Sequence, residues 1–432
     1  MRFRPFSLVE GNGFITLAKK LVAIGAKYGS NVNVEELLPC ATTVSRHLAS
    51  VVAREKDIMI AKLAQIAKFG ITTDLWTHEK TNVGYITVTA HFIDAEWKTV
   101  SVILATRSVE ERHTGKVIQQ TVRSILEEFR AYRPGNTYVT DNASSMKAAF
   151  YDNVWLGCSC HNLNLVLQHG FQAPTGKAHD TDDDEGLPHC VAGLINTCKE
   201  LVRLVKKTRL NSLLDTTLKQ SVPTRWNSTL ITLKSVNDNL ADLRVFGTDA
   251  ATNKNVLRLL ADVNEALLGE TIAVLQPFDT ATKQLSTDTK PAIHLVLPTK
   301  FQLKKHLSPS AADSMAVVQL KRHLQLQLEQ YFKVTVVHCS ATILDPRLKN
   351  NSAVMDLELR LKAISSLKEM VSNVTAEIPE IPSTDADTQE TTAEPPRKKI
   401  KTESAESGDS HFFDDLFAST SSIPVIDEVN YL

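Results

Sequence analysis

The chain has 432 residues, a hydrophobic content of 43% and a formal net charge of −1. This length exceeds what one ordinary hydrophobic core holds and predicts two or three domains. The near-neutral charge gives no global basic signature, so any contact with nucleic acid must come from local patches. No apolar run approaches the roughly 18 residues that a membrane span needs, which favours a soluble protein with no membrane partner. Secretion is not expected, because the first residues lack an apolar signal-peptide core and the six cysteines do not have the spacing of a disulfide framework.

The first part of the chain, residues 1–70, is expected to be an N-terminal helical region. Apolar residues recur at helical spacing in Phe14–Ile24 and Val44–Ile66, and lysines and arginines occupy the other face. After residue 70 the period changes from helix to strand.

Residues 71–172 carry an alternation of strands and helices. Within Tyr85–Phe92, apolar and polar side chains alternate, as in a half-buried strand. Strands are predicted at Ile71–Thr77, Tyr85–Phe92, Thr99–Leu104, Thr137–Thr140 and Trp155–Cys160. Helices are predicted at Val117–Phe129 and His161–His169. A further helix is predicted to begin near Ala143, with Asp141 or Asn142 as its N-cap residue. The order β-β-β-α-β-α-β-α predicts an α/β fold with a mixed sheet.

The remainder of the chain divides by composition. Residues 173–189, with the acidic run Asp180–Glu185, are predicted to be a linker loop. Residues 190–371 have helical period almost throughout and predict an all-helical domain. Residues 372–432 are rich in Pro, Ser, Thr, Asp and Glu, and we expect a disordered tail there.

Two acids close predicted strands of the sheet. Asp74 lies in Thr-Thr-Asp-Leu-Trp-Thr, and Asp141 follows the fourth strand in Val-Thr-Asp-Asn-Ala-Ser. Ligand sites of open α/β sheets gather where strands end. Two carboxylates from neighbouring strands there can hold Mg²⁺ or Mn²⁺, ions that prefer oxygen ligands and that assist phosphodiester cleavage. The alternative is that each Asp only caps a helix or closes a turn.

Several motifs in a fixed order carry a family resemblance. They are TTDLWT, YITVTAHFID, HTGKVI, VTDNASSMKAAF, CSCHNLNLVLQHG, VPTRWNSTL and LDPRLKN. With these motifs the chain resembles hAT-superfamily DNA transposases, and in particular the zinc finger BED domain-containing proteins derived from them, from Arg4 to roughly Lys349. The resemblance implies a ribonuclease-H-like sheet with an all-helical insertion domain.

Single residues can be matched to the family's motifs. Asp74 and Asp141 match the first two acids of an Asp-Asp-Glu catalytic triad, which would make them catalytic and metal-binding. Cys158 and His161 match a Cys-x-x-His motif that supports the active site. Trp226, in the family's Arg-Trp pair with Arg225, would stack on a flipped DNA base; the alternative is a buried packing residue.

Zinc is not expected. The candidate ligands are Cys158, Cys160, His161, His189 and Cys190. Cys158 and Cys160 would face the same side of the fifth strand, but the spacing is not that of a zinc finger. Structural support of the active site is the better reading of these residues.

The sequence also departs from the family pattern. The family's third acid lies in a later segment resembling ASSERVFS, which belongs to its dimerisation region, and no such motif occurs here; Glu428 is no substitute. No paired Cys and His ligands of a BED finger precede Arg4. We therefore expect an incomplete Asp-Asp-Glu site, in either a gene fragment or a host protein built from the element's middle.

Basic clusters give candidate contacts. The tail holds a basic cluster at Pro395–Lys401, which is either a nuclear-import or phosphate-binding signal or a solubilising charge run. It also holds an apolar stretch at Phe412–Phe417 that would form a docking turn. For DNA, the helical domain offers Arg203, Lys206, Lys207, Arg209, Lys304, Lys305, Lys321 and Arg322. Phosphate contacts and solvated helix faces explain these eight equally well.

These features predict a transposase-derived nuclear DNA- or chromatin-binding protein, with a role in transcription regulation and without complete catalytic activity. One alternative is an active hAT transposase that performs two-metal cleavage and strand transfer; another is a protein-interaction scaffold. The expected partners are DNA and either a second copy or a host nuclear protein, with no small-molecule substrate.

Overall fold

The computed structural model describes residues 6–29, 33, 38–171, 186–208, 210–222, 226–247, 254–287 and 290–376. The chain forms two compact units, residues 1–67 with 123–133, and residues 68–122 with 134–432. Residues 377–432 of the predicted disordered tail, with the Pro395–Lys401 cluster and the Phe412–Phe417 stretch, and most of the acidic loop lie outside the described residues. The predicted tail boundary at residue 372 is wrong, because residues 372–376 continue the last helix. Within the described part of the chain, no helix is long and apolar enough to cross a membrane.

The first unit is helical. It contains η1 (Phe6–Glu10), α1 (Asn12–Tyr28), α3 (Ala41–Leu63) and the end of α4 (Gly115–Glu128). The Arg133 guanidinium donates to the carbonyls of Leu63, Ala64 and Ile66 at 3.3, 3.3 and 3.1 Å. These carbonyls have no partner inside helix α3, so Arg133 both satisfies them and complements the negative end of the helix dipole.

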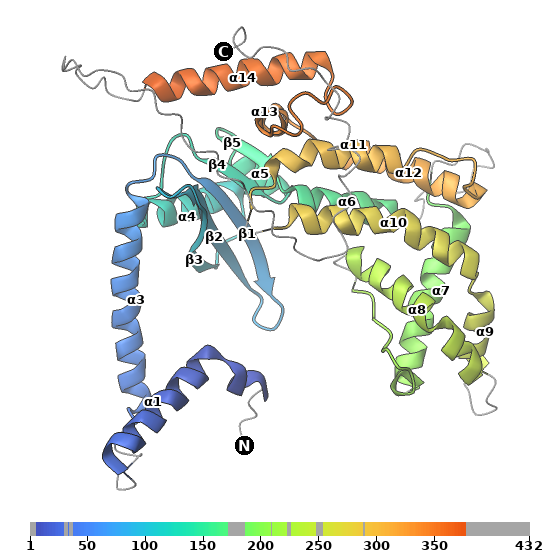
Figure 1. Ribbon diagram of the computed structural model, residues 1–432, viewed down its shortest axis with the longest axis horizontal. Helices are drawn as coiled ribbons and strands as arrows, with labels where there is room; N and C mark the ends of the chain where they lie inside the picture. The colour runs from blue at the N-terminus through green and yellow to red at the C-terminus, as the bar shows by residue number, and fades with distance from the viewer. Residues whose placement is uncertain are drawn as a thin grey trace, which may run out of the picture. The chain divides into compact units, whose positions relative to one another are not determined.

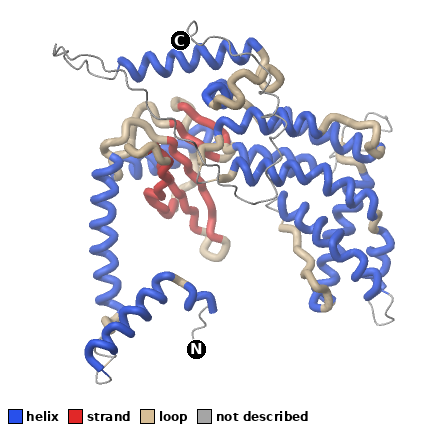
Figure 2. The backbone as a smooth tube through the Cα atoms, viewed as in Figure 1, coloured by secondary structure: helices blue, strands red, loops and turns tan. Residues whose placement is uncertain are grey.

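The second unit is built on one five-stranded mixed sheet (Figure 2). Its strands are β1 (Gly70–His78), β2 (Val83–Ile93), β3 (Thr99–Val109), β4 (Thr137–Thr140) and β5 (Val154–Gly157). Their spatial order is β3-β2-β1-β4-β5, with β1 antiparallel to β2 and parallel to β4. This arrangement confirms the predicted mixed α/β fold, and the strands and helices follow one another along the chain in the predicted order.

One face of this sheet is fully buried. Ile71 on β1 and Ile86, Val88 and Ala90 on β2 have no exposed surface. On β4, the ring of Tyr138 stacks on Phe150, which directly follows α5 (Ser144–Ala149), with centroids 4.4 Å apart. The alternating side chains of β1, including Thr72 and Asp74, are on the opposite face.

The boundary between the fifth strand and the next helix differs from the prediction. Strand β5 ends at Gly157, and α6 (Ser159–Gly170) begins directly after Cys158, its N-cap residue. Cys158 and Cys160 therefore do not share one side of a strand. The amide of Cys158 instead donates to the Thr140 carbonyl at 2.7 Å, which turns the chain out of the sheet into the helix.

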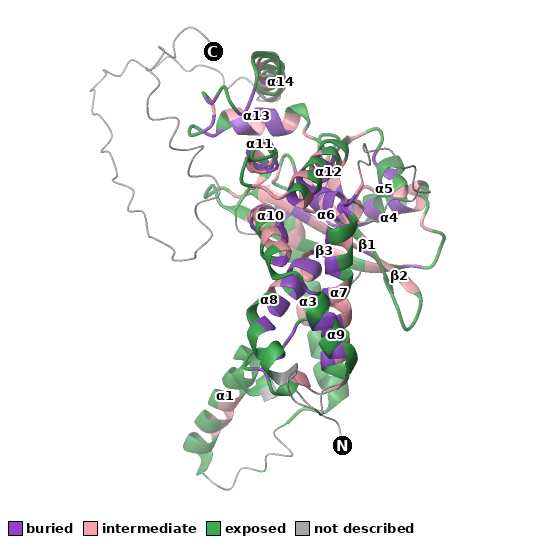
Figure 3. Ribbon diagram, turned by 90° about the vertical axis from the view of Figure 1, so that its right-hand side faces the viewer, coloured by how far each residue is buried: buried purple, intermediate pink, exposed green. Residues whose placement is uncertain are grey.

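The rest of the second unit is helical, which confirms the predicted all-helical region (Figure 1). The helices are α7 (His189–Lys207), α8 (Trp226–Gly247), α9 (Lys254–Asp262), α10 (Glu265–Leu285), α11 (Val296–His306), α12 (Met315–Tyr331), α13 (Val336–Leu344) and α14 (Leu357–Ala376), with the short turns η3 (Leu210–Ser212) and η4 (Ile293–Leu295). Helix α6 joins them, because its Leu163, Val166 and Leu167 belong to the helical hydrophobic core (Figure 3). The sheet and the helical region thus share one helix.

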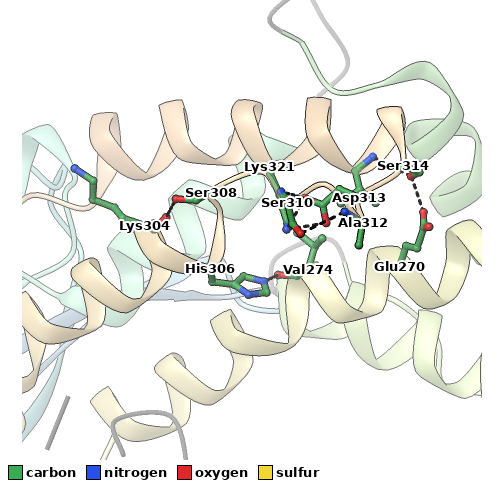
Figure 4. Close-up of polar contacts among 11 residues, drawn as sticks. Glu270, Val274, Lys304, His306, Ser308, Ser310, Ala312, Asp313, Ser314 and Lys321 are labelled. Carbon is green, nitrogen blue, oxygen red and sulfur yellow. Dashed lines mark hydrogen bonds and ion pairs between the residues drawn. The ribbon is translucent and has the colours of Figure 1, made fainter. Parts of the chain in front are cut away.

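The connection between α11 and α12 is fixed by polar contacts (Figure 4). Lys321 on α12 reaches back to Asp313, with Nζ 2.8 Å from Oδ2, and both side chains are nearly buried. The Ser310 amide donates to the same Asp313 oxygen at 2.7 Å, and the Ser314 hydroxyl donates to Glu270 of α10. A charge pair and hydrogen bonds therefore fix this loop, in addition to the apolar packing of Leu307 in the helical core.

Candidate metal and nucleic-acid site

The sheet places Asp74 and Asp141 on neighbouring strands. Strands β1 and β4 are parallel, with Gly70 opposite Thr137 and Thr72 opposite Val139. This pairing ends at Thr72 and Val139, and Asp141 directly follows β4. If the register continued by two residues, Asp74 and Asp141 would lie opposite each other on one face of the sheet. Neighbouring strands are about 4.8 Å apart, so two carboxylates in these positions can share one cation.

The contacts of the two carboxylates differ. Asp74 is exposed and makes no hydrogen bond or ion pair within the described part of the chain. One carboxylate oxygen of Asp141 accepts from the Ala143 amide at 3.1 Å, just before α5. Asp141 therefore closes a turn, as the alternative reading held, while its second oxygen makes no described contact. Three carboxylate oxygens remain for a hard cation, a donor set that fits Mg²⁺ or Mn²⁺ as part of an otherwise water-filled shell.

A larger metal cluster is not found. Among the residues that the structure describes, no three His, Cys, Asp or Glu side chains converge on a position that could hold an ion. The Mg²⁺ or Mn²⁺ site and the absence of zinc therefore stay predictions.

Cys158 and Cys160 line one cavity of about 180 Å³ next to the ends of β4 and β5. Its other walls are largely apolar, with Leu285 from α10 and Val296 from α11. A hydrogen bond from the Cys160 thiol and the amides at the start of α6 lower the pKa of Cys158 to about 6, while the same pairing and burial raise the pKa of Cys160. Two thiols this close cannot both ionise, and the helix N-terminus favours the thiolate at Cys158.

His161 is half-buried in the first turn of α6, three residues after Cys158. The next residue, Asn162, accepts a hydrogen bond from the Asn142 side chain, which follows Asp141 directly. The Cys-x-x-His segment is thus tied to the chain beside Asp141 through its helix. The supporting role assigned to Cys158 and His161 remains a prediction.

Trp226 begins helix α8 and is deeply buried, with 4% of its surface exposed. Its side chain belongs to the core of the helical region, and its amide donates to Asn164 of α6 at 3.3 Å. Arg225 lies outside the described residues. Stacking of Trp226 on a base, which requires an exposed ring face, stays a prediction beside the packing alternative.

The basic residues of the helical region are not equivalent. Lys206 and Lys207 at the end of α7 are exposed and have no partner among the described residues. Arg203, one turn earlier, is paired with Glu200 at 2.5 Å. Lys304 is paired with Glu329, and Lys321 is held by Asp313. Arg322 on α12 is likewise exposed and makes no hydrogen bond or ion pair among the described residues. Within this set Lys206 and Lys207 are the only two such cations that are adjacent in the described part of the chain.

Comparison with known proteins agrees with this geometry. Residues 72–154 match the model of the ZBED1 RNase-like domain, a span that contains both acids. Residues 2–43 match the Hermes transposase DNA-binding domain. The chain is a relative of the hAT transposases.

Individual relatives include transposases and regulators. The hobo transposase of Drosophila melanogaster is 29% identical over 376 residues, covering 85% of this chain and 55% of that protein. Zinc finger protein 618 of Mus musculus is 31% identical over 349 residues, 79% of this chain and 34% of that protein. The putative transcriptional regulator tpeD of Talaromyces stipitatus is 23% identical, over 85% of this chain and 45% of its own length. The chain thus spans about half, or less, of these relatives.

The match at residues 2–43 marks a region to which the sequence reading assigned no function. A local signal was present: α1 carries Lys19, Lys20 and Lys27 and no acidic residue. All three lysines are exposed, and none of the described side chains of α1 is buried. The near-neutral net charge of the whole chain gave no sign of the local positive charge on this helix.

Proposed function

We propose that this chain is a transposase-derived nuclear DNA-binding protein that acts on chromatin or transcription. The observation that carries the proposal is the match of residues 2–43 to a transposase DNA-binding domain, in which α1 bears three exposed lysines and no acid. Phosphate contacts need this kind of local positive charge even when the whole chain is near neutral. The kinship with the putative transcriptional regulator tpeD supports a regulatory role.

A second DNA contact is proposed at the end of α7. Lys206 and Lys207 are exposed and unpaired within the described residues, so they can replace the counterions of a phosphate backbone. Such contacts are independent of base sequence and weaken with salt. They would position the DNA rather than select its sequence.

The acid pair gives the proposal a second candidate function, DNA cleavage. Asp74 and Asp141 would hold Mg²⁺ or Mn²⁺, which when bound stabilises the attacking and leaving oxygens of a phosphodiester. The relationship to the hobo transposase supports this candidate. We place DNA binding first, because the lysines of α1 suffice for binding, whereas cleavage needs the ion and its complete ligand set.

Binding is tested by fluorescence anisotropy with labelled duplex DNA at increasing salt. We expect a linear fall of log K with log salt. The triple variant Lys19→Ala, Lys20→Ala, Lys27→Ala should bind more weakly with a shallower slope, by about one per lost phosphate contact. The pair Lys206→Ala, Lys207→Ala measures the second surface, and Lys362→Ala with Lys368→Ala on α14 is the control. No binding by the unaltered chain at low salt would leave a protein-interaction scaffold as the better function.

Cleavage is tested with the unaltered chain, Mn²⁺ and a duplex that carries terminal inverted repeats. Nicking that is lost in both Asp74→Ala and Asp141→Ala would establish the second candidate above the first. Asp152→Ala, which removes an exposed acid outside this pair, is the control. Nuclear localisation is tested separately, by microscopy of a fluorescent fusion with Arg397, Lys398 and Lys399 replaced by alanine; retention of the unaltered fusion in the cytoplasm would contradict it.

A further inference from the structure

Two aromatic rings lie together on the open face of the sheet, beside Asp74. Trp76 on β1 is paired in register with Tyr85 on β2, and their rings stack at 4.7 Å with an interplanar angle of 20°. Trp76 is 42% exposed. One large ring is therefore anchored by its neighbour while much of its surface faces solvent.

The residues around this aromatic pair on the open face of the sheet are polar. Asp74 and Trp76 are two residues apart on β1, on the face opposite that of buried Ile71 and Thr73. They share this face with Thr87, which is opposite Asp74 in register. The Thr87 hydroxyl is hydrogen-bonded to that of Thr106 on β3 at 3.0 Å. Over β4 the same face is covered, because Val139 lines the cavity closed by α10 and α11. The face is thus open over β1–β3 and closed over β4–β5.

We propose that Trp76, supported by Tyr85, is a stacking platform for a nucleobase of the DNA strand that reaches Asp74. This inference rests on the proposed DNA-binding function and adds a positioning residue to it. Asp74 and Trp76 are two residues apart on one strand, about 7 Å. That separation lets one nucleotide place its phosphate near the acid and its base on the indole.

The chemistry of the surface favours a nucleobase as the occupant. Every base has a π face that stacks on an aromatic ring without regard to sequence. The hydroxyls of the neighbouring threonines can donate to phosphate or sugar oxygens, which is a frequent contact in protein–DNA complexes. A flat ring beside hydroxyls and a carboxylate suits an unpaired nucleotide better than an apolar peptide, which would leave the carboxylate and hydroxyls unpaired.

The test uses anisotropy with the full chain and a labelled duplex that ends in a single-stranded overhang, with Ca²⁺ in place of Mg²⁺ or Mn²⁺ so that a cation can still lie between Asp74 and the phosphate. Trp76→Ala should weaken binding about 5- to 100-fold, whereas Trp76→Phe should keep most of the affinity. Trp97→Ala, at an 87% exposed tryptophan of the β2–β3 turn, is the control and should bind as the unaltered chain does.

A second measurement separates stacking from a structural role. Single abasic sites are placed along the overhang, and one position should lower affinity by the same factor as Trp76→Ala. Combined with Trp76→Ala, that abasic site should have no further effect. If Trp76→Ala fails to fold, the abasic scan on the unaltered chain decides, and a scan in which no position matters overturns the platform.

The outcomes also separate the two proposals. Failure of the unaltered chain to bind any DNA overturns the proposed function and the platform with it. Binding that is salt-sensitive and depends on the α1 lysines, but not on Trp76 or on any base of the overhang, overturns the platform alone.

Discussion

Gly157 and Asn142 lie so close that a Cβ atom added at Gly157 would be 2.5 Å from the Asn142 side-chain oxygen. The Asn142 side chain in turn donates to Asn162 of α6. A glycine at the end of β5 therefore lets the segment after Asp141 pack against the start of the Cys-x-x-His helix.

Gly157→Ala should displace Asn142 and break its bond to Asn162. We expect a loss of about 1–3 kcal/mol in the free energy of unfolding, as for overpacked sites, measured by urea denaturation. Gly193→Ala is the matched control: nothing lies within 4 Å of an added Cβ there, and alanine should stabilise helix α7 by about 0.5–1 kcal/mol. Equal effects of the two substitutions would contradict this account of Gly157.

The thiol of Cys158 should be the more reactive of the pair that lines the cavity. The hydrogen bond from Cys160 lowers the pKa of Cys158, whereas the same pairing and burial raise the pKa of Cys160, and burial raises the pKa of Cys198 to about 12. Near neutral pH, Cys158 therefore holds the largest thiolate fraction of these three. Alkylation by iodoacetamide, followed thiol by thiol with mass spectrometry, should reach its plateau rate near pH 7 at Cys158 and stay slow at Cys198.

The variant Cys160→Ala tests the cause of this lowered pKa. It removes the thiol that donates to Cys158, so the alkylation profile of Cys158 should move to higher pH. An unchanged profile would assign the lowered pKa to the amides at the start of α6 alone.

The predictable part of the fold was encoded locally. Alternation in Tyr85–Phe92 identified β2, and Asp141 directly follows β4, as the sequence predicts. The prediction that Asp74 ends the first strand is wrong: β1 continues to His78, because its pairing with β2 extends four residues past Asp74. The boundary at Cys158 was missed because strand and helix meet without a linker, and two residues are too few to show a period. Burial of Trp226 depends on packing against α6, about 60 residues away, which no local pattern reports.

Ion pairs, too, can be predicted from the sequence only where the two partners are close along one helix. The contact of Arg203 with Glu200 is an i,i+3 helix pair that can be read from the sequence. Lys321 lies on helix α12, whereas its partner Asp313 lies in the loop before that helix. No helical spacing relates the two residues, so the sequence alone presents Lys321 as an exposed cation.

Lys321→Met should destabilise the protein strongly. It leaves the Asp313 carboxylate, which is 13% exposed, without its cation. Removing one side of a pair that is largely shielded from solvent costs more than removing one side of an exposed surface pair. The double variant Lys321→Met, Asp313→Leu should recover part of the loss in urea denaturation. A single variant as stable as the unaltered chain would contradict the structural role of this pair.

The stability of the chain should fall in acid partly because of His338. This residue is 4% exposed, and burial lowers its pKa to about 4, while its Nδ1 accepts from the Thr335 amide at 3.0 Å. Between pH 6.5 and 4 the unfolded chain binds a proton at this position and the folded chain does not, so the contribution is present above pH 6.5 and is lost as pH falls towards 4. The loss from this group reaches about 3 kcal/mol. His338→Gln keeps an acceptor for the Thr335 amide and should flatten the decline of the unfolding free energy between pH 6.5 and 4. An equally steep decline in the variant would assign the acid sensitivity to other histidines whose pKa is lowered by burial, such as His306.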